Sequence, residues 1–204
     1  MPDDPAQRRV FLFFAAAALL TLWWLWHRRA ALRRRHLDLT DRRLAGCIAA
    51  FVLYPLTVLV HEWGHVLAVR ATGGEVVEIQ WSLIEGAVLS RGPDSAAASW
   101  FVAAAGPAAG ALAALVLGTI AWRGERLPML VRLACMLAAA IAGVHNLVLY
   151  PLLAADGAGD FAVVYGEPSP MALRAAGVAV HVAALVHLCR GGRAHFDALL
   201  RRAG

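Results

Sequence analysis

Apolar blocks long enough to cross a lipid bilayer make up most of this chain, and they constrain its fold more than any other feature. A spanning α-helix needs about 20 consecutive, mainly apolar residues. Of the 204 residues, 60% are hydrophobic and 16% are charged, whereas a soluble domain is usually about one quarter charged. The sequence therefore predicts an all-α integral membrane protein, forming a single domain over residues 1–204 with about five transmembrane helices. The expected segments are residues 10–26, 44–69, 98–122, 129–153 and 171–189.

The basic residues are placed at the ends of these blocks. All 19 are arginine, and seven of them lie within residues 27–43. This placement is typical of the charges that orient membrane proteins. The net charge of +5 therefore predicts an interaction with the lipid bilayer and not with nucleic acid. The distribution favours an outside N-terminus and an inside C-terminus. Arginine without lysine, together with alanine-rich blocks, indicates a GC-rich bacterial source, and we expect the bacterial cytoplasmic (inner) membrane.

A polar, glycine-containing interval separates the second and third apolar blocks, at residues 70–97. Within it, residues 76–84 partly alternate between apolar and polar side chains and have turn residues at both ends. This pattern predicts a short β-hairpin inserted after the second transmembrane helix.

The second apolar block contains the motif His61-Glu62-Trp63-Gly64-His65. Two histidines four residues apart lie one turn apart on the same face of a helix, where their imidazoles can hold one Zn²⁺ ion. The adjacent Glu62 can then act as the general base toward water. Ionisable side chains are costly inside a membrane helix, which favours a functional site over a polar cluster that merely packs helices. The sequence thus predicts His61 and His65 as metal ligands and Glu62 as a catalytic residue.

A catalytic zinc site needs a third protein ligand. Asp156 is the predicted one, because Pro151 would interrupt the fourth helix and Gly157 would allow a tight turn that directs the carboxylate inward. Asp160, about one turn further along, is the alternative.

Several motifs occur together in an order that resembles the site-2 protease family of intramembrane metalloproteases, in particular its M50B-like branch. They are the HExxH motif in a membrane helix, the glycine-rich interval after it, Gly106-Pro107 in the next helix, and the later Asn146, Pro151 and Asp156-Gly157. The resemblance covers about residues 44–165 and implies an intramembrane zinc protease that hydrolyses peptide bonds in or near transmembrane segments of membrane proteins.

The resemblance also implies roles for single residues. It gives His61 and His65 as zinc ligands, Glu62 as the base and an aspartate of the Asp-Gly element as the third ligand. Asn146 is expected to act in catalysis, by binding substrate or stabilising the oxyanion. It further implies that the HExxH helix runs inward, whereas the arginine distribution makes this helix run outward, and the sequence leaves that choice and the oligomeric state open.

Other membrane functions fit the sequence less well. Residues Gly157-Ala158-Gly159-Asp160 match the G-x-G-D pattern of aspartyl intramembrane proteases, but no second aspartate lies in a membrane block. A rhomboid-type serine protease would need a Gly-x-Ser-Gly element, which is absent. The remaining alternative is a non-proteolytic membrane protein that binds a metal or another helix.

Overall fold

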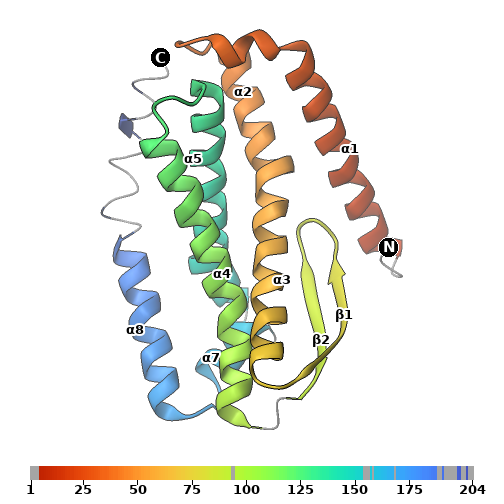
Figure 1. Ribbon diagram of the computed structural model, residues 1–204, viewed down its shortest axis with the longest axis vertical. Helices are drawn as coiled ribbons and strands as arrows, with labels where there is room; N and C mark the ends of the chain where they lie inside the picture. The colour runs from red at the N-terminus through yellow and green to blue at the C-terminus, as the bar shows by residue number, and fades with distance from the viewer. Residues whose placement is uncertain are drawn as a thin grey trace.

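The computed structural model describes residues 5–92, 95–153, 157, 159–167, 169–187, 190, 197–198 and 201. Within these residues the chain forms a helical bundle with one small two-stranded sheet, which confirms the predicted all-α membrane fold (Figure 1). Among the described residues, four helical segments are long and apolar enough to cross a membrane, where about five were predicted. The fifth predicted segment corresponds to a shorter apolar helix, Met171–Val186. The four long segments are Pro5–His27, Leu39–Ala71, Ala96–Arg123 and Met129–Leu152.

Three of the helices form the centre of the bundle. α3, α4 and α5 contact one another, while α1 and α8 lie on opposite sides of them (Figure 1). The helices are α1 (Pro5–His27), α2 (Leu39–Ile48), α3 (Tyr54–Ala71), α4 (Ala96–Arg123), α5 (Met129–Val144), α6 (Tyr150–Leu153), α7 (Asp160–Tyr165) and α8 (Met171–His187), with a 3-10 turn η1 (Arg29–Arg33) and two π-helical turns, η2 (Ala49–Leu53) and η3 (His145–Leu149).

The predicted hairpin is present after the second long segment. β1 (Glu75–Trp81) pairs antiparallel with β2 (Gly86–Arg91), so the stretch 76–84 singled out in the sequence supplies the first strand and the turn. The hairpin turns back from the end of α3 and lies alongside that helix, on the side facing α1 (Figure 1). It therefore places β2 beside the middle of α3, where the HEWGH motif lies.

The same five residues, Val-Leu-Tyr-Pro-Leu, stand at the end of each π-helical turn and directly after it, at 52–56 and 148–152. A proline has no N–H to give to the carbonyl four residues earlier. In both turns the tyrosine N–H bonds to the carbonyl five residues earlier, Tyr54 to Ala49 and Tyr150 to His145. Pro151 was predicted to interrupt the fourth helix, and the structure shows this disturbance as η3, after which the helix continues to Leu153.

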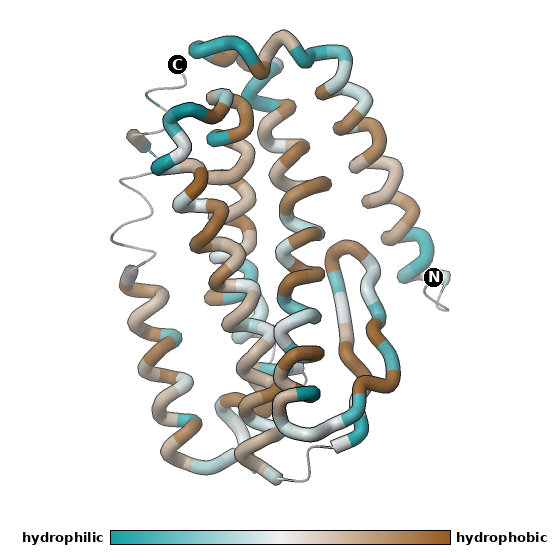
Figure 2. The backbone as a smooth tube through the Cα atoms, viewed as in Figure 1, coloured by the Kyte–Doolittle hydropathy of each residue, from teal (hydrophilic) through white to brown (hydrophobic). Residues whose placement is uncertain are grey.

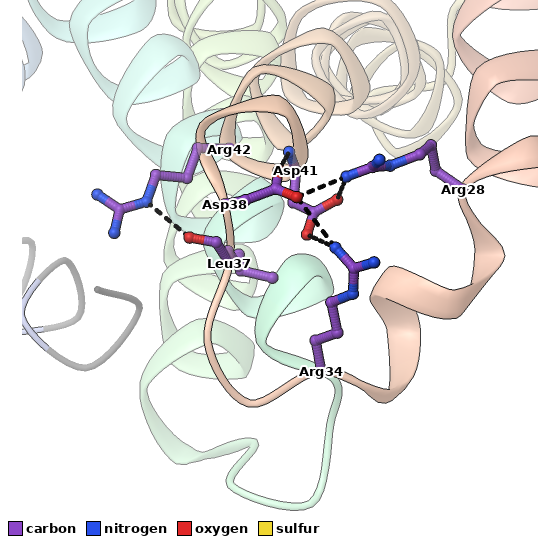
Figure 3. A network of polar contacts seen from close by, with 6 residues as sticks. All are labelled: Arg28, Arg34, Leu37, Asp38, Asp41 and Arg42. Atoms are coloured by element: carbon purple, nitrogen blue, oxygen red, sulfur yellow. Dashed lines mark hydrogen bonds and ion pairs between the residues drawn. The ribbon is translucent and has the colours of Figure 1, made fainter.

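A network of ion pairs fixes one end of the bundle (Figure 3). The Asp41 carboxylate is completely buried at the start of α2 and accepts hydrogen bonds from Arg28 at 2.6 Å and Arg34 at 2.9 Å. Both arginines also contact the half-exposed Asp38, which caps α2 by accepting the Asp41 backbone N–H at 2.8 Å. That backbone hydrogen bond and then Arg28 hold the pKa of Asp38 below its usual value. The network therefore ties both ends of η1, which connects α1 to α2, to the start of α2.

The arginine-rich connections lie at this same end of the bundle. The α1–α2 and α4–α5 connections form its most hydrophilic part (Figure 2). Near it, the buried Arg132 of α5 donates to the Ala121 carbonyl at 2.9 Å and so satisfies one of the last carbonyls of α4. His61 lies about 30 Å along the helix from Leu39, at about 1.5 Å per residue, but only about 15 Å from the other end at Ala71. The HEWGH motif is thus well removed from the arginine-rich end.

We expect Asp41→Asn to lower the stability of the protein in detergent micelles by about 1–3 kcal/mol, because it weakens two charge-assisted hydrogen bonds to a buried carboxylate. Asp38→Asn is the matched control, since its side chain is half exposed and asparagine also caps helices well. Thermal unfolding followed by circular dichroism measures both variants. An equal loss in the two would show that burial of Asp41 is not what makes this network stabilising.

Candidate metal centre

The two histidines of the motif lie where α3 and α4 come into close contact. His61 and His65 are both buried on the face of α3 that meets α4. A Cβ built on Gly64 would lie 2.5 Å from the Ala105 carbonyl oxygen of α4, and one built on Gly106 would lie 2.1 Å from Nε2 of His65. Glycine at both positions is therefore required for this approach, because any larger residue would overlap the facing atoms.

The surroundings of each imidazole orient its ring. His65 Nδ1 lies 2.8 Å from the carbonyl oxygen of Val102, and His61 Nδ1 lies 3.4 Å from Oδ1 of Asn146. Both partners are acceptors, so each Nδ1 is assigned the proton and each Nε2 keeps a lone pair. The two Nε2 atoms are 3.2 Å apart. The two Nε2 lone pairs are therefore close enough to be shared by one ion.

Asp160 brings a third acceptor to the same place. Its Oδ2 lies 3.0 Å from Nε2 of His61 and 3.1 Å from Nε2 of His65. These three ligand atoms lie within 4.8 Å of one another, and they are the group of possible metal ligands found among the described residues. Three acceptor atoms therefore converge on one place.

The short helix α7 positions Asp160 as its first residue. Gly159 precedes it with a φ of +79°, a conformation that favours glycine. The other end of α7 is held by Trp100 of α4, whose indole N–H donates to the Val164 carbonyl at 3.1 Å, and by Ser169, which donates to the Val163 carbonyl at 2.6 Å. Asp156, the third ligand predicted from the sequence, lies outside the described residues. The structure brings its alternative, Asp160, to the two histidines.

Asn146 lies in η3, and both ends of its carboxamide are engaged. Its Nδ2 donates to the Ala142 carbonyl at 2.9 Å, which fixes the amide so that Oδ1 faces His61. Gly110 makes room for it, since a Cβ there would lie 2.7 Å from Oδ1. The resemblance gave Asn146 a part in substrate binding or oxyanion stabilisation. In the structure the amide is placed to orient a histidine.

Glu62 is buried beside the histidines, and no described residue bonds to its Oε2. A Cβ on Gly86, the first residue of β2, would lie 2.4 Å from the Glu62 carboxyl group. The hairpin backbone is therefore in contact with this carboxylate. A buried carboxylate oxygen without a partner is costly unless water or a substrate group reaches it.

A cavity of about 570 Å³ opens over this cluster. Its walls are the motif residues of α3, the strand β2, the start of α4, Tyr150 and the start of α7. Tyr150 also donates from its hydroxyl to Asp160 Oδ2 at 3.2 Å. Tyr150 and Gly86 were not among the site residues predicted from the sequence. Two features of the sequence could have pointed to these residues. Tyr150 is a polar aromatic residue directly before Pro151, and Gly86 is a glycine at the start of the second strand.

The chain matches one family model, described as Peptidase M50B-like, over residues 15–203. No match was found among the curated proteins or among the solved structures. The matched region contains every residue of the cluster described above.

We expect Gly106→Ala to reduce zinc binding at least tenfold, because its methyl group would occupy the space of the His65 imidazole. Gly118→Ala is the control in the same helix, since its nearest neighbour is 3.8 Å away and alanine favours helix formation by about 1 kcal/mol. Elemental analysis of the purified variants and thermal unfolding measure the two effects. Full zinc occupancy in Gly106→Ala would show that the close approach of α3 and α4 is not needed for the site.

Proposed function

The chain belongs to the M50B-like peptidase family, and on that premise we propose that it is an intramembrane zinc metalloendopeptidase. The family assignment makes it a site-2 protease-type metallopeptidase, in a family whose peptidases are generally zinc-dependent. The proposal adds that His61, His65 and Asp160 hold the ion, that Glu62 is the catalytic base, and that the substrates are membrane proteins cut in or near their transmembrane segments.

The convergence of three acceptor atoms carries this proposal. Two histidine nitrogens and one carboxylate oxygen are a donor set typical of catalytic zinc sites, which use three protein ligands and keep one position open. Their separations of 3.0–3.2 Å are close to the roughly 3.3 Å expected between ligands of a tetrahedral ion with bonds of about 2.0 Å. Three acceptors this close repel one another unless a cation or protons lie between them. The residues present therefore fit zinc.

A bound zinc ion would supply a Lewis acid that polarises a carbonyl group and acidifies water. The residues of the chain do the rest. Glu62 Oε2 is free to take a proton from the attacking water and deliver it to the amine nitrogen as the C–N bond breaks. Asn146 and the Val102 carbonyl keep the proton on Nδ1 of each histidine, so that both Nε2 atoms remain available.

A substrate must reach the site in an extended form, since a helix hides its carbonyl groups from attack. β2 forms one wall of the cavity, and among the described residues it pairs with β1 along one edge and with no strand along the other. The other edge leaves backbone N–H and C=O groups available for an added strand. A locally unwound segment of a membrane protein can pair there and bring a peptide bond to Glu62.

Glu62→Gln is expected to keep its zinc and to lose about 10²–10⁴-fold in hydrolysis, because the amide has the shape of the base but cannot accept the proton. The assay compares cleavage of peptides that carry glycine- or proline-containing transmembrane segments with zinc content measured by elemental analysis. Unchanged cleavage, or unchanged function in cells, would sink the protease proposal in favour of a metal-binding or helix-binding membrane protein.

Separate Asp160→Ala and Asp156→Ala variants identify the third ligand. We expect the first to lose zinc during purification and the second to retain it, because Asp160 Oδ2 lies within 3.1 Å of both imidazoles. Loss of zinc from Asp156→Ala alone would restore Asp156 as the ligand. Retention by both variants would place the third ligand elsewhere.

A further inference from the structure

A third histidine, His181 of α8, connects two segments that support the candidate metal centre. Its Nε2 lies 2.7 Å from the carbonyl oxygen of Leu147 in η3, and its Nδ1 is hydrogen-bonded to the hydroxyl group of Tyr165 at the end of α7. The ring also stacks on Tyr165, with centroids 5.9 Å apart. His181 itself contacts none of the three ligand atoms.

The Leu147 carbonyl lies where Pro151 disturbs the backbone hydrogen bonding of the helix. In a regular α-helix its oxygen would accept the N–H of residue 151, but that residue is proline and has none. A carbonyl left without a donor in an apolar bundle is costly. His181 supplies the donor from a neighbouring helix.

These partners also determine the tautomer of His181. Because a carbonyl can only accept, Nε2 carries the proton. In the neutral ring Nδ1 is then an acceptor, and the Tyr165 hydroxyl donates to it. The result is a directed series of hydrogen bonds, from the Tyr165 hydroxyl to the imidazole and from the imidazole to the Leu147 carbonyl. Only one neutral tautomer of His181 satisfies both neighbours.

Both ends of this series of hydrogen bonds lie in segments that carry residues of the candidate metal centre. Leu147 directly follows Asn146, whose carboxamide orients His61. Tyr165 ends the six-residue helix α7, which begins with Asp160. α8 packs tightly on this helix, since a Cβ on Gly177 would lie 3.1 Å from a methyl group of Val164. One imidazole therefore ties the segment that supports His61 to the segment that carries Asp160.

We propose that His181 is a positioning residue, which sets the placement of Asp160 relative to His61 through Tyr165 and the Leu147 carbonyl. This rests on the proposed zinc site. His181→Phe keeps an aromatic ring in place but removes both hydrogen bonds. We expect it to weaken zinc binding about 10–100-fold, the usual effect of losing an outer-shell partner. Competition with a chelator measures the affinity, on the full chain in detergent.

A second substitution tests the route through Leu147. Pro151→Ala gives residue 151 an N–H that can bond to the Leu147 carbonyl, so His181→Phe is expected to cost much less affinity in that background. Tyr165→Phe removes the other half of the link and is expected to weaken zinc binding by an intermediate amount. An equal loss from His181→Phe with and without Pro151 would overturn the route through Leu147.

The control is His27→Phe, which removes another histidine bonded to a helix carbonyl, that of Trp23 at 2.9 Å, in α1. The visible absorption bands of the Co²⁺-substituted protein report ligand geometry, which a general loss of stability does not move. We expect them to shift in His181→Phe and to stay unchanged in His27→Phe. Wild-type affinity and an unshifted spectrum in His181→Phe would overturn the positioning role. Absence of zinc binding by the unaltered protein would overturn the proposed function, and the positioning role with it.

Discussion

The close contact between α3 and α4 is the interaction on which the candidate site depends. In a bilayer, helices gain little from hydrophobic burial against each other, and small residues that allow close packing take its place. Gly64 and Gly106 provide this on the two sides of the contact. The same approach brings the Val102 carbonyl to His65 and the α4 backbone against both imidazoles. The same helix contact therefore both packs the bundle and orients the two histidines.

Around this contact, polar groups are satisfied by partners on other helices. Val102, Asn146 and Tyr150 each bond to one member of the cluster, and each comes from a different element. This arrangement is what an apolar setting demands, because lipid cannot supply missing partners. The exception is Glu62, whose Oε2 faces no described donor. A group left unsatisfied within an otherwise satisfied cluster is where chemistry is expected.

The sequence predicted the features that depend on local spacing. His61 and His65 share a helix face because they are four residues apart, and no other part of the fold can change that. The hairpin was also visible, because alternation and turn residues are local signals. Local spacing could not decide between Asp156 and Asp160 as the third ligand. Both follow Pro151 and stand beside a glycine, so the pattern treats them alike, and only the path of the chain into α7 brings Asp160 to the histidines.

Longer-range contacts left no signal in the sequence. A glycine at the start of β2 reads as a turn residue, and its contact with Glu62 follows from how the hairpin lies along α3. The part played by Asn146 depends on η3, which turns its carboxamide toward His61. His181 is one of two histidines in its apolar block, and no metal-ligand type of residue lies three or four positions from it. Such residues become recognisable only when separate helices are placed together.

The depth of the motif along its helix has a consequence for a protein cut beside it. His61 lies about 15 Å from the end of the helix at Ala71, at about 1.5 Å per residue. With Ala71 at the membrane boundary, this is about half the thickness of a hydrocarbon core of about 30 Å. A substrate helix of about 20 residues cut at this depth would be divided into two pieces of about ten residues each. Neither piece would keep the apolar length that a spanning helix needs, so cleavage by the proposed protease would weaken the membrane anchoring of both products.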